Sequence, residues 1–270
     1  MKAVRVGDLK IGAGLVIIAG PCVIEDEKTT LKTLELLKKA AEDIGLPLIF
    51  KSSYDKANRT SISSYRGPGL KKGLSILEKA KREFSVPILT DVHCRTEVEA
   101  VAEVADVIQI PALLSRQTDL LVSAGRTKRA INIKKGQFMS PRDIRHAIDK
   151  VLSTGNRNII LTERGTSFGY NNLIVDFRGI PIMRDMGFPV VFDATHSVQM
   201  PSALGKSSGG DRKMAKYLLR AAVAVGVDGV FMEVHQDPER ALCDGPNSIA
   251  LKDFKSAVAR LKEMDRAARG

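Results

Sequence analysis

Eight short apolar segments, each followed by a polar loop and a longer helical segment, set the plan of the chain after residue 14. In the helical segments Leu and Ala recur at three- and four-residue spacing, which is the pattern of an amphipathic helix, and several segments end in glycine. Eight such units in about 250 residues predict an α/β protein, a (β/α)8 TIM barrel. The apolar segments cover residues 15–20, 46–53, 86–92, 106–112, 130–136, 158–165, 188–196 and 228–235. The clearest helical segments cover residues 29–45, 70–84, 141–155 and 214–226.

Two β-like pieces around Gly7 and Asp8 precede the first repeat and predict a short N-terminal β-hairpin over residues 1–13. No stretch of linker composition divides the chain, so we expect residues 1–270 to form a single barrel domain. An open doubly wound sheet is the alternative. It normally carries a glycine-rich nucleotide-binding turn after its first strand, whereas the turn here reads GPC and does not fit G-x-G-x-x-G.

The net charge of +11, from 42 basic and 31 acidic residues, indicates a protein that attracts anions. The basic residues are spread along the chain, and there is no tryptophan and only 5% aromatic content, so no platform for stacking nucleic-acid bases is evident. We therefore expect small phosphorylated or carboxylated substrates and no nucleic-acid partner.

Several features indicate a cytoplasmic protein without a membrane partner. No apolar run approaches the length of a membrane span, and the N-terminal MKAVRVGDLK lacks the apolar core of a signal peptide. Three widely spaced cysteines argue against a disulfide framework and for a reducing compartment.

Every one of the eight apolar segments ends in polar or reactive residues. In a (β/α)8 barrel the catalytic groups lie at the carboxyl ends of the strands, so we expect these side chains to meet in one mouth. The alternative for each residue alone is that strand ends are simply polar. The residues are Cys22, Lys51, Ser53, Asp91, His93, Gln109, Lys134, Lys135, Glu163, Arg164, Asp193, His196, Glu233 and His235.

Several of the residues at or after the strand ends are lysines and arginines, which we treat as one cationic group. The loop over residues 51–69 is dense in Lys, Arg, Ser and Thr but has no block of like charge. Arginine can grip a phosphate with two prongs, whereas lysine acts as a point charge, so converging cations favour a ligand with more than one anionic group. A solvated surface loop is the alternative. The group consists of Lys51, Lys56, Arg59, Lys134 and Arg164.

A second group combines a thiol, an imidazole and two carboxylates: Cys22, His196, Glu233 and Asp244. This mixed donor set predicts a site for a borderline divalent metal such as Zn²⁺, Fe²⁺ or Mn²⁺. A buried cysteine and a hydrogen-bonded histidine are an equally ordinary interpretation of these residues. We interpret Cys243 as a sequence neighbour of Asp244, with an extra thiol at the site as the alternative.

Two glycine-rich loops, residues 165–172 and 201–211, can hold phosphate against backbone amides, or they can be mobile lids or plain linkers.

Several longer motifs in the sequence resemble those of a known family. They are AGPC at 19–22, FKSSYDKANR at 50–59, TDVH at 90–93, NIKKGQF at 132–138, LTERGTSFGYNNLIVDFR at 161–178, FDATHSVQ at 192–199 and FMEVHQDPERALCDGPN at 231–247. Together they resemble the 3-deoxy-D-manno-octulosonate 8-phosphate (Kdo-8-phosphate) synthase family, a group of transferases.

The resemblance implies the condensation of phosphoenolpyruvate with D-arabinose 5-phosphate and water, which gives Kdo-8-phosphate and inorganic phosphate for lipopolysaccharide synthesis. It also implies a homotetramer. The expected phosphoenolpyruvate ligands are Lys51, Ser53, Lys56, Gln109, the amide of Ala112, Lys134 and Arg164. The expected sugar-phosphate ligands are Asn58, Arg59, Thr60 and, from a neighbouring subunit, Arg116. The expected catalytic residues are His196, His93, Lys56 and Asp244.

The same family divides into metal-dependent members, with cysteine at the position of Cys22, and metal-independent members, with asparagine there. The run CDGPN around Asp244 is similar to the metal-independent branch. The resemblance through Cys22 implies one divalent metal per subunit, held by Cys22, His196, Glu233 and Asp244, and no organic cofactor.

Other functions remain as alternatives. A synthase of the shikimate pathway, which resembles this family in its AGPC strand, would use erythrose 4-phosphate instead of the five-carbon sugar. A non-catalytic barrel would bind phosphoenolpyruvate without turnover, and a nucleic-acid binder would show steep salt dependence.

Overall fold

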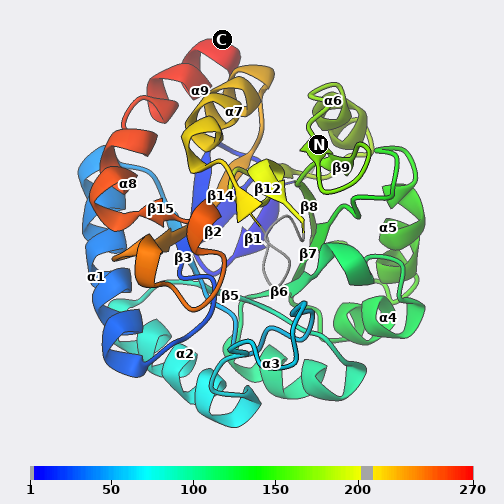
Figure 1. Ribbon diagram of the computed structural model, residues 1–270. Coiled ribbons are helices and arrows are strands. Elements are labelled where there is room, and N and C mark those ends of the chain that lie inside the picture. The colour runs from blue at the N-terminus through cyan, green and yellow to red at the C-terminus, as the bar shows by residue number, and fades with distance from the viewer. Residues whose placement is uncertain (1–2, 202–208, 270) are drawn as a thin grey trace.

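Eight parallel strands close into a ring inside a layer of helices (Figure 1). The computed structural model describes residues 3–201 and 209–269. The strands neighbour one another in chain order, and the last of them pairs with both the first and the seventh, which closes the ring. The (β/α)8 barrel is therefore confirmed, and the open sheet is wrong. The barrel strands are β3 (Val16–Gly20), β4 (Leu48–Lys51), β5 (Ile88–Asp91), β6 (Val107–Ile110), β7 (Ala130–Lys134), β8 (Ile159–Glu163), β11 (Val190–Asp193) and β14 (Gly229–His235).

The helices form the outer layer, and each presents one apolar stripe to the strands, as their sequence spacing predicts. The first begins after Asp26, whose side chain accepts a hydrogen bond from the Thr29 amide at 2.8 Å, and it ends at Gly45 in the left-handed region with φ 68°. The helices are α1 (Glu27–Ile44), α2 (Leu70–Phe84), α3 (Val98–Val104), α4 (Thr118–Arg126), α5 (Ile144–Leu152), α6 (Gly179–Arg184), α7 (Arg212–Val225), α8 (Leu251–Val258) and α9 (Leu261–Arg269).

Shorter strands lie in the loops between the barrel strands and the helices. They are β9 (Thr166–Ser167), β10 (Leu173–Ile174), β12 (Gln199–Met200), β13 (Gly209–Gly210) and β15 (Ile249–Ala250). The glycine-rich loop expected over 201–211 lies mostly outside the described residues. Within the described residues, no helix is both long and apolar enough to span a membrane.

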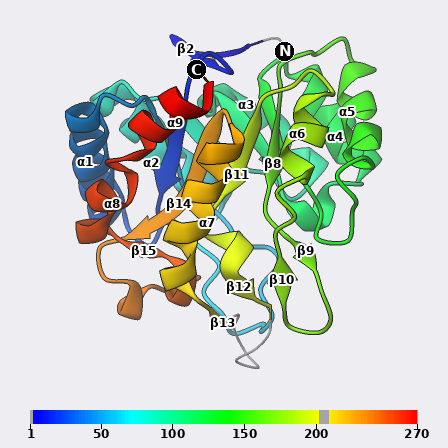
Figure 2. The same cartoon turned by 90° about the horizontal axis from the view of Figure 1, so that it is seen from above.

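A hairpin of β1 (Val4–Val6) and β2 (Leu9–Ile11) closes one end of the barrel. Its three buried apolar side chains, Val4, Val6 and Ile11, pack in one cluster with the side chains that point into the barrel. Figure 2 shows the hairpin at the end opposite β12 and β13. The predicted N-terminal hairpin is thus confirmed, although residues 1 and 2 lie outside the described part of the chain.

Strand alternation explains how a barrel with an apolar floor acquires a charged mouth. Residues two apart on a strand point to the same face. The inward apolar layer next to the hairpin consists of Val16, Ile18, Ile49, Leu89, Val107, Ala130, Ile160, Val191 and Phe231. Two positions further along five of these strands, at the carboxyl ends, the residues are Lys51, Asp91, Gln109, Asp193 and Glu233, each at most 5% exposed. Polar groups at these positions are therefore placed inside the barrel.

A glycine allows β3 and β4 to approach each other at the level of this charged layer. A Cβ atom added to Gly20 would lie 1.9 Å from the carbonyl oxygen of Lys51. We expect Gly20→Ala to lower the free energy of unfolding by at least ~2 kcal/mol, because backbone must move to make room. The measurement is the shift of the denaturant midpoint. Gly14→Ala is the control, since no atom lies within 4 Å of its added Cβ and a change below ~0.5 kcal/mol is expected. Equal midpoints for the two variants would contradict this reasoning.

Candidate functional site

Two lysines and a glutamate form a buried ionic group at the mouth. The Lys51 ammonium donates to Glu233 Oε1 and to the carbonyl oxygen of Cys22, both at 2.9 Å. The Lys56 ammonium lies 3.7 Å from the same Glu233 oxygen, which is beyond hydrogen-bonding distance. Lys56 therefore has donors available for a ligand.

A third lysine lies near the same aromatic ring as the first. Lys134 donates to Asp193 Oδ2 at 2.6 Å, and its ammonium lies 3.9 Å from the centre of the Phe231 ring; that of Lys51 lies 5.6 Å from the same centre. Burial and the nearby positive charge of Lys51 lower the pKa of Lys134, although Asp193 opposes this. Two buried ammonium groups near one ring favour a ligand that carries negative charge.

An arginine completes the cationic group. Arg164 is 4% exposed and donates through Nη2 to Gln199 Oε1 at 3.1 Å. Its Nη1 is buried and, among the described residues, has no hydrogen-bond partner. A buried guanidinium nitrogen without an acceptor is costly unless a ligand supplies one. An anion in the mouth would satisfy it.

Hydrogen bonds link the carboxyl ends of β4 and β5. Ser53 Oγ donates to Asp91, whose other oxygen lies 3.0 Å from His93 Nε2. Burial alone would lower the pKa of His93, but the hydrogen bond and charge of Asp91 raise it above its ordinary value of 6.5. Burial acts against ionisation of Asp91 as well, yet His93 holds the pKa of that carboxyl well below its usual range.

Two further predicted ligands lie at the carboxyl end of a single strand, β6. Gln109 is buried, and its Oε1 accepts a hydrogen bond from Asn132 Nδ2 at 3.3 Å, which leaves its amide nitrogen to donate. Ala112 begins a short 3-10 helix, Ala112–Leu114, directly after β6.

The proposed metal ligands fall into two overlapping groups that share Asp244. Asp244 Oδ2 lies 3.2 Å from Cys22 Sγ and 3.8 Å from His196 Nε2. His196 Nε2 also lies 3.8 Å from Glu233 Oε1. Atoms bound to one Zn²⁺ at about 2.0–2.3 Å are separated by roughly 3.5 Å, so these spacings suit a common ion.

The surroundings of these groups also fit a divalent metal. Asp193 Oδ2 lies 2.8 Å from His196 Nδ1, which fixes the ring and directs Nε2 to Glu233 and Asp244. Glu233 Oε2 is buried and has no hydrogen-bond partner among the described residues, so one carboxylate oxygen is available for coordination. Burial, together with the adjacent Cys243 sulfur, raises the pKa of the Cys22 thiol, and a metal would have to displace its proton. These residues could hold one metal ion.

The structure adds a residue that we interpreted from sequence as a mere neighbour. Cys243 Sγ lies 2.9 Å from Cys22 Sγ, 3.5 Å from Asp244 Oδ2 and 2.8 Å from Arg59 Nη1. Adjacent residues of an extended strand point apart, but Asp244 adopts a left-handed conformation with φ 48°, which brings both side chains to Cys22. The only signal in the sequence is the turn-forming DGP after the cysteine.

Three predicted ligands are not joined to the cationic group. Asn58, Thr60 and Arg116 are exposed. Their side chains make no hydrogen bond or ion pair with the other predicted ligands within residues 3–201 and 209–269. Arg116 instead lies on the loop before α4, where its carbonyl oxygen accepts a hydrogen bond from Lys150 at 2.8 Å.

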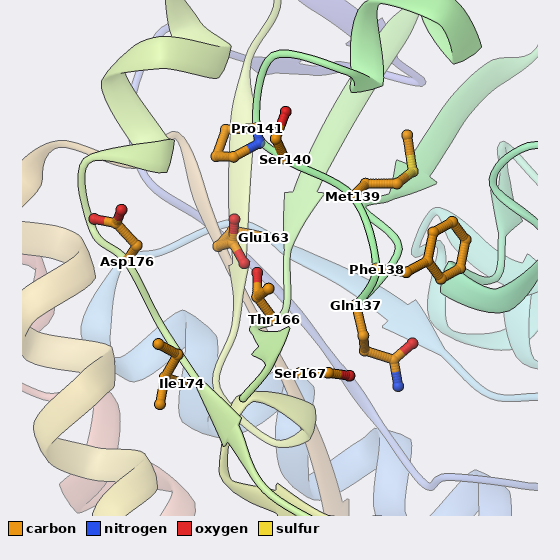
Figure 3. Close-up of a pocket in the computed structure, with 10 residues that line it drawn as sticks. All are labelled: Gln137, Phe138, Met139, Ser140, Pro141, Glu163, Thr166, Ser167, Ile174 and Asp176. Atoms are coloured by element: carbon orange, nitrogen blue, oxygen red, sulfur yellow. The ribbon is translucent and has the colours of Figure 1, made fainter. Parts of the chain in front are cut away.

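Lys135 and Glu163 do not point into the mouth, so the expectation that every polar strand end meets there is wrong. Strand alternation sends Lys135 to the side opposite Lys134. Its ammonium donates to Thr166 Oγ1 at 3.0 Å and lies 3.6 Å from Glu163 Oε1. Glu163 and Thr166 line a separate cavity of about 440 Å³ beside residues 137–141 (Figure 3). We therefore interpret Lys135 as a structural residue, which links its own loop to Glu163 and Thr166.

The His93–Asp91 pair can be tested by titration. We expect NMR of the histidine rings in chelator-treated protein to give His93 a pKa above 6.5, and Asp91→Asn to lower that pKa, because burial then acts without its partner carboxylate. Asp8→Asn, on the exposed hairpin, is the control. A raised pKa favours folding below pH 6.5, and this contribution disappears as the pH rises through the folded-state value. An unchanged His93 titration in Asp91→Asn would contradict the assignment.

Comparison with known proteins now places the chain. It is 59% identical to the 2-dehydro-3-deoxyphosphooctonate aldolase of Geotalea daltonii and 58% identical to that of Geotalea uraniireducens, in each case over 98% of both chains. The protein of the same name from Geobacter sulfurreducens is 56% identical, again over 98% of both. The sequence model of the DAHP synthetase I family matches residues 2–269, and the chain belongs to that family.

Proposed function

We propose that the protein condenses phosphoenolpyruvate with D-arabinose 5-phosphate and water to give 3-deoxy-D-manno-octulosonate 8-phosphate and inorganic phosphate. Full-length relatives at 55–59% identity carry the name 2-dehydro-3-deoxyphosphooctonate aldolase, which refers to this product. The observation that carries the proposal is the buried cationic mouth. There the ammonium groups of Lys51 and Lys134 lie near the Phe231 ring, and Arg164 Nη1 has no hydrogen-bond partner among the described residues.

Phosphoenolpyruvate carries a carboxylate and a phosphate, and the buried cations suit both. In our proposal Lys51, Lys134 and Arg164 neutralise them, and Lys56 contributes the donors that Glu233 leaves free. The neutral donors are Ser53, Gln109 and the amide of Ala112. Because these groups are already buried and oriented, little reorganisation accompanies the reaction.

The sugar phosphate is assigned to the outer loop. Asn58, Arg59 and Thr60 would bind it, together with Arg116 of a neighbouring subunit in a homotetramer. The exposure of Asn58, Thr60 and Arg116 is consistent with groups that a ligand or a second subunit covers. The proposed setting is the cytoplasm, in the Kdo branch of lipopolysaccharide synthesis.

The bond changes follow from these positions. C3 of the enol attacks the aldehyde carbon of the sugar, and the aldehyde oxygen takes a proton. Water adds at C2 and loses one proton, which balances the proton given to the sugar oxygen. Phosphate then leaves with the electron pair of its C2–O bond and takes up the remaining proton of the new C2 hydroxyl, so that C2 becomes a ketone. His196, whose ring Asp193 orients, would help to position this water beside C2. Lys56 or His93 would supply the proton to the sugar oxygen, and Asp244 would orient the water.

Cys22, His196, Glu233 and Asp244 would hold one divalent metal per subunit, without an organic cofactor. When bound, such an ion supplies Lewis acidity that favours ionisation or orientation of a water molecule. The residues around it position the substrates and handle the protons.

A second candidate function comes from the family match, whose description names DAHP synthetase. It differs in the aldehyde, which would be erythrose 4-phosphate. Phosphate release from phosphoenolpyruvate, measured with each sugar phosphate, distinguishes the two.

We expect phosphate release with D-arabinose 5-phosphate to be at least tenfold faster than with erythrose 4-phosphate. A strong chelator should abolish it, and Mn²⁺ or Zn²⁺ should restore it. Full activity after verified metal removal would support the proposed condensation but contradict a role for the metal in it. No release with either sugar would defeat the proposed function and leave a binding role.

The role of the buried lysine can be tested separately. Lys134→Gln should lower kcat/KM for phosphoenolpyruvate by about 10²-fold or more, because the charge developing on the substrate loses a fixed partner. Lys10→Gln, an exposed change on the hairpin, should leave kcat/KM unchanged. Thermal unfolding of both variants controls for damage to the fold. A Lys134→Gln enzyme with near-normal kcat/KM would remove Lys134 from the site.

A further inference from the structure

We infer that Cys243 is a second sulfur ligand, so that the metal site presents two thiolates rather than one. This inference rests on the metal site of the proposed function and adds to it a residue outside the four expected ligands. The sulfur of Cys243 belongs with Cys22 and Asp244 to a group whose ligand atoms all lie within 4.8 Å of one another. Asp244 also belongs to a second such group with His196 and Glu233, so the two groups adjoin at this carboxylate.

The individual contacts place Cys243 as close to the Asp244 carboxylate as the expected ligands. Its sulfur is 3.5 Å from Asp244 Oδ2, whereas His196 Nε2 is 3.8 Å from the same oxygen. The two sulfurs are 2.9 Å apart, and at Zn–S bonds of about 2.3 Å a modest separation of the two would place one ion between them. Cys22 and Cys243 are each 4% exposed, so neither sulfur is directed to solvent.

The backbone around Cys243 holds this arrangement. Asp244, in its left-handed conformation, accepts hydrogen bonds through its carbonyl oxygen from the amides of Asn247 at 3.1 Å and Ser248 at 3.0 Å. Gly245 follows against the carbonyl oxygen of Pro238, which a Cβ at Gly245 would meet at 2.3 Å. The turn is thus fixed on both sides, and it presents Cys243 and Asp244 together.

Charge balance supports two thiolates in one site. Two thiolates and two carboxylates around a divalent ion leave a net negative charge, which is costly to bury without nearby cations. Three cations are in place: Lys51 and Lys56 beside Glu233, and Arg59, whose Nη1 donates to Cys243 Sγ at 2.8 Å. The competing explanation is that Cys243 only positions Arg59 and leaves the metal to Cys22.

Two sulfur ligands would restrict the metals that the site binds tightly. Thiolates favour softer ions such as Zn²⁺ and Cd²⁺, whereas Mn²⁺ and Mg²⁺ prefer oxygen ligands. The site should therefore bind Zn²⁺ and Cd²⁺ more tightly than Mn²⁺, and it should give Co²⁺ the absorption bands of sulfur-to-metal charge transfer.

Co²⁺ loading under a non-thiol reductant tests the inference without recourse to activity. The charge-transfer absorbance per bound Co²⁺ should fall to about half in both Cys22→Ser and Cys243→Ser and vanish in the double variant. Cys94→Ser, at an exposed thiol, should keep the full intensity. Full intensity in Cys243→Ser with complete loss in Cys22→Ser would overturn the inference, as would a wild-type protein that shows no such band.

X-ray absorption on the unmodified Zn²⁺ protein removes any dependence on variants that fold poorly. Two sulfur neighbours at about 2.3 Å are expected, and a single one would refute the second ligand. Phosphate release assayed on the same sample separates this result from the proposed function. Two sulfur neighbours without turnover would support the second sulfur ligand and contradict the proposed function. One sulfur neighbour with turnover would support the proposed function and contradict the second sulfur ligand.

Discussion

Glu233 is the carboxylate on which the charged interior of the barrel depends. One of its oxygens accepts a hydrogen bond from Lys51 at 2.9 Å and lies within 4 Å of Lys56 and His196. Burial acts to raise the pKa of this carboxyl, but the surrounding positive charges outweigh it and keep the pKa well below its ordinary value. A buried charge that loses its partners costs several kcal/mol, about 3–5 in measured cases. The burial of both lysine charges therefore depends on the opposite charge of one residue in β14.

The barrel accommodates these charges because strand alternation separates two layers within one interior. The floor is apolar and sealed by the hairpin, and the layer above it is ionic. Phe231 lies between them, with the ammonium groups of Lys51 and Lys134 near its ring. A cation near an aromatic face recovers part of the solvation that it loses on burial. The same strands thus provide the packing that stabilises the fold and the charges that bind a ligand.

The sequence was sufficient to predict the barrel, the hairpin and the inward position of residues such as Lys51 and Lys134, because strand period and strand ends are local properties. It was misleading for Lys135 and Glu163, because a position at the end of a strand does not determine whether the side chain points into or out of the barrel. It was insufficient for Cys243. The contact of Cys243 with Cys22 joins positions 221 residues apart and depends on a left-handed residue, and no spacing rule encodes either feature.

The closed floor has a consequence for the order of events. Within the described residues, Val4, Val6 and Ile11 block the end of the barrel opposite the site, which leaves the side of the charged mouth for ligands to enter and leave. The buried Lys51 and Lys134 lie deep in this chamber, and the exposed Asn58 and Thr60 lie at its rim. A molecule seated at the rim obstructs the passage of one seated in the depth. Under the proposed assignment, the ligand held by Lys51 and Lys134 therefore binds before the ligand held at the rim.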